Sequence, residues 1–293
     1  MKEEILKLGI TGINVRYSLE NKPVVLLLHF SGGNSYMWDG IVAQLKQEYS
    51  IIAPDFRGHG KSDKPAAGYH IDDMANDMYL LLKYFNIDKC HIIGSSMGAE
   101  VGLSLASVHP ELVLSFVCEG ALYNEFGEYG VFNGSLAEIE KQKEIMRGEL
   151  AKREEKIFAR IEDYVEAERA ELMQSGIWNE YFKTFFEHNL QPLADGKFTY
   201  CYLNHVRNEY IQKYWDLKLE DYYKKVKCKI LFLPSEEERQ DEKICYSLSV
   251  FAGLLETYEI EYIKNSLHAY VWMQLPAEAG RVAKNFIDKY NKI

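Results

Sequence analysis

The sequence predicts an α/β protein with a doubly wound, mostly parallel sheet, and two observations support this class. Over residues 23–118, short continuous apolar runs alternate with segments whose apolar residues recur at helical spacing. The same pattern returns from residue 228 to the C-terminus. Strands that are apolar on both faces and alternate with helices are typical of parallel βαβ units. The stretch between the two blocks shows no clear buried strand, which indicates an insertion.

Before the first block, the segment Ile5 to Leu19 contains Gly9 and Gly12 and predicts an antiparallel hairpin at an edge of the sheet. Buried strands are expected where apolar runs are bounded by turn residues, at 23–29, 50–54, 89–94 and 112–118. Helices are expected where apolar residues lie three or four apart, at 38–48, 71–85 and 99–108. In the second block we expect strands at 230–233 and 259–263, a helix at 244–255 and a last helix from residue 276.

Residues 121–227 are expected to form a helical cap insertion between two parts of the core, 1–120 and 228–293. Within it, residues 135–173 predict a charged amphipathic helix or helical hairpin, interrupted near Gly148. This long helix would be compatible with a homodimer. The insertion is rich in aromatic residues, which either line an apolar ligand cavity or fill a small core of their own.

Composition narrows the class of partner. Lys and Arg number 34 against 44 Asp and Glu, so the formal net charge is −10, which repels nucleic acid and anionic lipid. The five cysteines are scattered without C-x-x-C spacing, which favours a reduced, cytoplasmic protein over a disulfide framework or a zinc ribbon. The N-terminal residues lack an apolar signal region, and no run is long enough to span a bilayer. We therefore expect a small-molecule substrate and no membrane or nucleic-acid partner.

One motif carries a specific chemistry. Gly94-Ser95-Ser96-Met97-Gly98 fits G-x-S-x-G, follows an apolar strand and precedes a helical segment, which is the context that this motif requires. The turn is tight, so glycines flank it, and Ser96 is exposed above the carboxyl edge of the sheet. Ser95 stands at the variable position and is expected to be an ordinary turn residue. The motif predicts Ser96 as a nucleophile.

With this motif the chain resembles the α/β-hydrolase superfamily over nearly its whole length, and the insertion corresponds to the family's cap domain. The segment 29–33, His-Phe-Ser-Gly-Gly, resembles the family's oxyanion loop, with Phe30 in place of its first glycine. The segment 55–62, Asp-Phe-Arg-Gly-His-Gly-Lys-Ser, resembles a structural turn of the family. The resemblance implies an oxyanion hole made by the backbone amides of Ser31 and Met97.

The family's chain order of serine, acid and histidine implies His268 as the general base, because it follows the last predicted strand and precedes the C-terminal helix. The acid is open. Aligning strand ends favours Glu238, a slip of one residue would favour Glu237, and Glu119, at the end of an earlier strand, is the alternative. The carboxylate would orient the imidazole and stabilise its positive charge.

The resemblance implies a serine hydrolase of the esterase type that needs no metal and no organic cofactor. Relatives that open epoxides or displace halide use an aspartate nucleophile, so Ser96 argues against those reactions. We expect a small or medium apolar ester as substrate. The alternatives are a non-catalytic small-molecule-binding protein and a hydrolase of C–C, thioester, amide or lactone bonds. Candidate substrate-binding residues are Phe30, Tyr123, Trp178 and Trp215.

Overall fold

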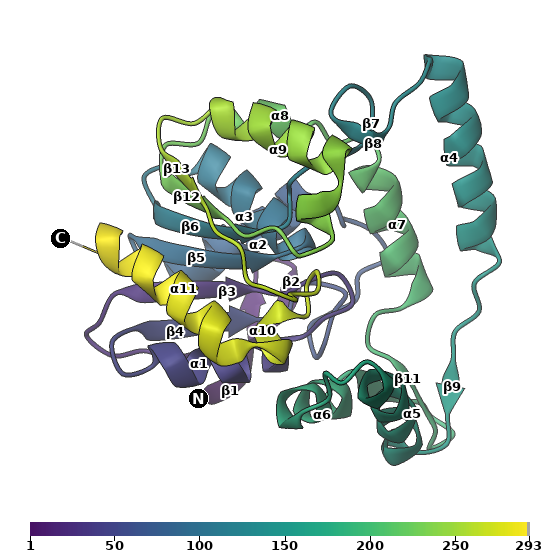
Figure 1. Ribbon diagram of the computed structural model, residues 1–293. Coiled ribbons are helices and arrows are strands. Elements are labelled where there is room, and N and C mark those ends of the chain that lie inside the picture. Colours follow the sequence, from purple (N-terminus) through teal and green to yellow (C-terminus); the bar gives the residue numbers. More distant parts are fainter. Residues whose placement is uncertain (292–293) are drawn as a thin grey trace.

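A computed structural model describes residues 1–291 of the 293-residue chain (Figure 1). Its main sheet has eight strands in the order β1-β2-β4-β3-β5-β6-β12-β13. The six strands from β4 to β13 in this order run parallel, and β1 and β2 form an antiparallel hairpin at one edge. The predicted class, a doubly wound and mostly parallel α/β sheet, is confirmed.

The bounds of the elements follow the apolar pattern closely. The strands of the main sheet are β1 (Lys2–Leu8), β2 (Thr11–Ser18), β3 (Val24–Leu28), β4 (Ser50–Pro54), β5 (Cys90–Ser95), β6 (Val113–Glu119), β12 (Lys229–Phe232) and β13 (Tyr258–Ile260). The helices that accompany them are α1 (Asp39–Leu45), α2 (Ile71–Tyr84), α3 (Met97–Val108), α8 (Leu219–Tyr223), α9 (Glu242–Gly253), α10 (Val271–Gln274) and α11 (Pro276–Tyr290).

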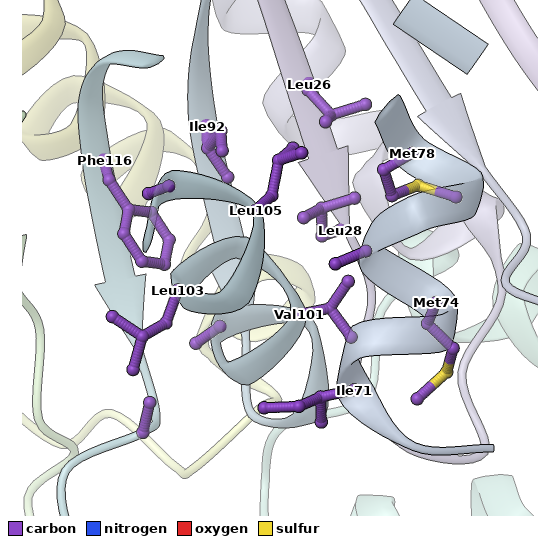
Figure 2. Packing of buried hydrophobic residues seen from close by; sticks show 14 of the residues in the cluster. Leu26, Leu28, Ile71, Met74, Met78, Ile92, Val101, Leu103, Leu105 and Phe116 are labelled. Atoms are coloured by element: carbon purple, nitrogen blue, oxygen red, sulfur yellow. The ribbon is translucent and has the colours of Figure 1, made fainter. Parts of the chain in front are cut away.

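The core consists of two apolar layers, one on each face of the sheet. Successive residues of β3 alternate between them: Leu26 and Leu28 belong to the layer under α2 and α3, whereas Val25 and Leu27 belong to the layer under α1 and α11. Figure 2 shows the first layer, in which Met78 of α2 and its neighbours on α3 pack against side chains of β3, β5 and β6. This double cover explains why the central strands are apolar without alternation.

Between β6 and β12 the chain leaves the main sheet. This part contains β7 (Asn124–Phe126), β8 (Gly130–Phe132), α4 (Leu136–Ala151), β9 (Ile157–Phe158), α5 (Ile161–Gln174), α6 (Glu180–Glu187), β10 (Leu190–Pro192), β11 (Phe198–Tyr200) and α7 (Asn204–Tyr214). In Figure 1, α4 lies at the periphery of the molecule. No helix among residues 1–291 combines the length and the apolar character that crossing a bilayer demands.

Two details of the insertion differ from the prediction. The break in the helical stretch falls between α4 and α5 and not at Gly148, which lies inside α4. Nothing lies within 4 Å of the position of a Cβ at Gly148, so no close contact requires glycine there. The glycine only lowers the intrinsic helix propensity of this position. The insertion also contains short strands, and β9 pairs with β11. These strands have two or three residues, too few to produce a recognisable apolar run.

Candidate active site

The turn between β5 and α3 places Ser96 at the carboxyl edge of the sheet. Ser96 has φ 50° and ψ −119°, a strained conformation for a residue with a side chain. The chain passes from strand to helix across this single residue, so the hydroxyl projects away from both elements. The backbone of this turn matches the geometry that the motif predicts for a nucleophile.

Three glycines allow neighbouring segments to approach this turn. A Cβ on Gly98 would lie 2.1 Å from the carbonyl oxygen of Leu28, and one on Gly94 would lie 2.6 Å from the carbonyl oxygen of Gly98. Gly120, just after β6, has φ +128°, and its Cβ would lie 2.7 Å from the Cα of Ser96. These distances are far below van der Waals contact, so the site requires glycine at all three positions.

His268, in the loop between β13 and α10, reaches Ser96. Its Nε2 lies 3.0 Å from Ser96 Oγ, within hydrogen-bond distance. The next residue, Ala269, has φ 62°, which turns the chain so that its amide points back toward β6. The structure thus brings together the serine and the histidine that the sequence singles out, although 172 positions separate them.

Both candidate acids contact the same ring nitrogen. His268 Nδ1 lies 3.0 Å from Glu238 Oε1 and 3.2 Å from Glu119 Oε1. The two carboxylates are buried, whereas the imidazole is partly open to the cavity described below. Glu237, which a slip of one residue would favour, is exposed and forms no ion pair with His268 among the described residues. The single Nδ1 proton therefore lies between two acceptors.

The two carboxylates differ in their other hydrogen bonds. Glu119 Oε1 also accepts from the Ala269 amide at 2.8 Å, and Oε2 accepts from Ser95 Oγ at 2.6 Å and from Trp272 Nε1 at 3.2 Å. Glu238 Oε2 accepts from the Ser235 amide at 2.8 Å, and its Oε1 faces His268. Glu119 thus ties the β5 turn and the histidine loop to the end of β6.

Ser95 is one residue that the sequence did not reveal as important. It was expected to be an ordinary turn residue, but its side chain is fully buried and donates to Glu119. The strand register explains this, because Ser95 lies opposite Glu119 in the β5–β6 pair. No local signal could have shown it, since a small residue at a variable motif position fits any turn.

The two carboxylates set the charge of the imidazole. Burial alone lowers the pKa of His268, but attraction to Glu119 and Glu238 outweighs burial and raises the pKa well above 6.5. Burial raises the pKa of Glu238, but the hydrogen bond and attraction to His268, together with the hydrogen bonds from Ser235, outweigh burial, so that the pKa is lowered overall. The arrangement stabilises an imidazolium, the species that forms when the base takes a proton from serine.

The amides of Ser31 and Met97 are the predicted oxyanion donors; Ser31 lines the same cavity as Ser96, and Met97 is the next residue in the chain after Ser96. Met97 is the first residue of α3, whose N-terminus carries free amide groups and a positive dipole end. Among residues 1–291, neither amide donates to a backbone acceptor. Phe30, in place of glycine, has no positive φ and therefore causes no strain. The loop is fixed because His29 Nε2 accepts from the Phe56 amide at 3.0 Å.

A cavity of about 340 Å³ opens beside Ser96 and His268. Its lining is aromatic, aliphatic and acidic: Ser31, Ser96, Glu100, Gly120, Ala121, Leu122, Tyr123, Glu125, Met146, Tyr210, Ile211, Tyr214, Trp215, Glu238 and His268. Residues of the core and of the insertion both contribute. The sequence did not single out Glu100, Glu125, Tyr210 and Tyr214 as binding residues, because only the packing of α7 against α3 and β7 places them together.

Two of the four predicted substrate-binding residues line this cavity and two do not. Tyr123 and Trp215 face it. Phe30 and Trp178 do not line it, and Phe30 packs against Phe185 and Tyr270. Trp178 stacks on Phe186 within the layer that includes α6. Both rings fill apolar space between α6 and the core.

Glu119, Glu238 and His268 offer three potential ligand atoms within 4.8 Å of one another. Nδ1 is the nitrogen that contacts both carboxylates, and a nitrogen that donates its proton cannot also offer a lone pair to a metal. The raised pKa of His268 favours this protonated form. The geometry therefore suits a hydrogen-bonded acid–base group better than a metal centre.

Comparison with known proteins points to one family. A family model described as alpha/beta hydrolase fold matches residues 23–199. An uncharacterized protein of Mycobacterium tuberculosis is 44% identical over 91 residues, which are 31% of this chain and 27% of that protein. The 2-(acetamidomethylene)succinate hydrolase of Mesorhizobium japonicum is 34% identical over 110 residues, which are 38% of this chain and 39% of that enzyme. The matches thus span well under half of these relatives.

Solved structures match over the whole chain. A crystal structure of E-2-(acetamidomethylene)succinate hydrolase superposes with a TM-score of 0.77, covers 98% of this chain and 99% of its own, and is 21% identical. A thioesterase domain from the curacin biosynthetic pathway has a TM-score of 0.77 at 16% identity, with 97% and 99% coverage. At these identities the likeness shows the shared fold.

Proposed function

Because the chain belongs to the alpha/beta hydrolase fold family, we propose that it is a serine hydrolase that cleaves a small or medium apolar carboxylic ester. The observation that carries this proposal is the contact of 3.0 Å between Ser96 Oγ and His268 Nε2, on an imidazole whose other nitrogen faces buried carboxylates. Several relatives that match part of the chain are named as hydrolases, which supports the same class of reaction.

In the proposed reaction, His268 Nε2 takes the proton of Ser96 while Oγ attacks the ester carbonyl carbon. The amides of Ser31 and Met97 stabilise the negative oxygen of the tetrahedral intermediate. The intermediate then collapses, the C–O bond to the alcohol breaks, and His268 returns the proton to the leaving oxygen. Water, deprotonated by His268, releases the acid from the acyl-enzyme and restores the Ser96 hydroxyl.

The cavity supports an ester with an apolar body. Leu122, Met146 and Ile211 line it together with aromatic rings, and a volume of about 340 Å³ suits a small or medium molecule. The carbonyl carbon must lie beside Ser96, so the acyl or the alcohol part would occupy the space toward α7.

A fluorophosphonate probe tests the nucleophile. We expect it to label the wild-type protein at Ser96 and to leave Ser96→Ala unlabelled. Ser249→Ala is the matched control, because Ser249 is an exposed serine on α9, and we expect it to be labelled like wild type. No labelling of wild type would instead favour a protein that binds small molecules without turnover, and equal labelling of Ser96→Ala would show that Ser96 is not the nucleophile. Esters of p-nitrophenol with graded acyl length then define the substrate size.

A further inference from the structure

Two carboxylates that the proposed reaction does not use face the cavity. Glu100 lies on α3 four residues after Ser96, which places it on the same helix face one turn further on. Its residue surface is only 5% exposed. Glu125, in β7, is half-buried and lines the same cavity. Acidic side chains in a largely apolar cavity are costly unless they have a partner.

Neither carboxylate has a Lys or Arg partner among residues 1–291; the positive charge of His268, in the same cavity wall, acts on Glu100 without forming an ion pair with it. The cavity lining contains no Lys or Arg, and no ion pair to Glu100 or Glu125 exists within residues 1–291. Glu100 Oε2 accepts one hydrogen bond, from Tyr210 Oη at 2.8 Å, and its Oε1 accepts none from the described residues. Only one oxygen of the buried Glu100 carboxylate therefore has a hydrogen-bond donor among the described residues, and Glu100 is part of the cavity wall.

The electrostatics agree with this geometry. Burial raises the pKa of Glu100 to about 7; the Tyr210 hydrogen bond and attraction to His268 oppose the rise, and the nearby Glu125 adds to it. Burial also raises the pKa of Glu125. A positive charge between the two groups would relieve both effects.

Aromatic rings in the cavity lining would also contribute to binding a cation. Tyr123, Tyr210, Tyr214 and Trp215 line the cavity together with the two carboxylates. The faces of such rings attract ammonium groups, most strongly where water is excluded. The Arg147 guanidinium lies 5.9 Å from the centre of the Trp215 ring, whereas among the described residues no Lys or Arg lies over the rings of the three tyrosines. Carboxylates and tyrosine faces of this kind favour an organic cation and disfavour an anionic ligand.

We propose that Glu100, Glu125 and the surrounding rings form a subsite for an ammonium group, so that the ester cleaved at Ser96 carries an amine or quaternary ammonium on its apolar body. The cleavage part of this inference rests on the proposed function, whereas the binding part does not. Glu100 lies about 6 Å along the helix axis from Ser96. The ammonium group would thus lie only a few bonds from the ester carbon.

Binding of two small probes tests the subsite without turnover. Pentylammonium and pentan-1-ol have similar size and differ in charge, and calorimetry near pH 8 would measure their dissociation constants. We expect wild type to bind pentylammonium at least about tenfold more tightly, and this ratio to fall toward one in Glu100→Gln and in Glu125→Gln. Glu128→Gln is the matched control, since Glu128 is exposed after β7 and lies outside the cavity lining. Equal binding of the two probes by wild type, or an unchanged ratio in both cavity variants, would overturn the subsite.

Kinetics then separate this inference from the proposed function. Butyrylcholine has a positively charged nitrogen where 3,3-dimethylbutyl butyrate has a neutral carbon, and the two esters are otherwise the same. We expect a kcat/KM at least about tenfold higher for the charged ester. Equal hydrolysis of both esters would contradict the substrate class while leaving the serine hydrolase in place. Absence of hydrolysis of both, with selective binding of pentylammonium, would contradict the proposed function and retain the cation subsite.

Discussion

His268 lies between two buried carboxylates, and this arrangement determines how the site responds to pH. Only the neutral imidazole can accept the proton of Ser96, so activity requires a pH above the pKa of His268. That pKa is raised well above 6.5. The site therefore combines strong stabilisation of the imidazolium with an inactive, protonated base at low pH.

The first prediction concerns the pH profile. We expect kcat/KM for a neutral p-nitrophenyl ester to fall as the pH decreases through a value well above 6.5. Glu119→Gln and Glu238→Gln each remove one negative charge beside Nδ1, so each should move the acid limb to lower pH. Glu237→Gln is the control on the same loop as Glu238, because Glu237 is exposed. An acid limb at the same pH in all three variants would contradict this account of His268.

The second prediction separates the roles of the two acids. Glu238 Oε1 faces only His268, whereas Glu119 also accepts from Ser95, Ala269 and Trp272. We expect Glu238→Gln to lower kcat by roughly a hundred- to ten-thousandfold, because the ring loses its orienting acceptor. Glu119→Gln should lower the free energy of unfolding by about 1–3 kcal/mol, since buried donors lose their acceptor. Thermal unfolding and kcat, measured on both variants, would show a reversed pattern if Glu119 were the orienting acid.

At the scale of single elements, the β5 turn works because three segments approach without side chains between them. Gly98 of α3 faces the end of β3, and Gly120 after β6 faces Ser96. The strain at Ser96 is maintained by this packing, which leaves the residue no room to relax. The nucleophile is therefore positioned by neighbouring backbone as much as by its own turn.

The third prediction tests this close approach. In Gly98→Ala the new methyl group would lie 2.1 Å from the Leu28 carbonyl oxygen, so α3 must shift away from β3. We expect a loss of stability of about 1–3 kcal/mol and a large loss of fluorophosphonate labelling. Gly148→Ala in α4 is the matched control, because nothing lies within 4 Å of the added group. It should stabilise the helix by up to about 1 kcal/mol and leave labelling unchanged.

At the scale of the whole molecule, the insertion forms part of the cavity wall through side chains of α4 and α7. A small apolar cluster of Phe126, Leu150 and Trp215 joins β7, α4 and the end of α7. Lys143 of α4 also pairs with Asp216 at 2.6 Å. The contacts that hold α4 in place are thus few, and Met146 of the same helix lines the cavity.

The fourth prediction follows from this limited attachment. Leu150→Ala should loosen α4, because it removes one of the three buried side chains of the cluster. We expect faster amide hydrogen exchange in α4 and a higher KM, with a melting temperature close to that of wild type. Ile145→Ala, at an exposed position of the same helix, should change neither quantity. Slow exchange in α4 of Leu150→Ala would show that other contacts hold this helix.

Much of the main sheet could be predicted because its strands carry their own signal. A strand covered on both faces must be apolar along its whole length, so β3, β4 and β5 are visible as local runs. The turn at Ser96 is equally local, since its glycines stand beside it in the chain. The break between α4 and α5 was misplaced because glycine lowers helix propensity without ending a helix whose surroundings permit it.

The sequence by itself determined the α/β class, the order of the strands along the chain and the one serine that the β5 turn exposes. Only the tertiary structure decided that Glu119 and Glu238 both reach His268 Nδ1, that Ser95 supports Glu119, and that Glu100 faces the cavity. The physical reason is the range of the interactions involved. Backbone conformation and apolar burial depend on neighbours along the chain, whereas a hydrogen bond or a cavity wall depends on where distant loops end after the sheet has assembled.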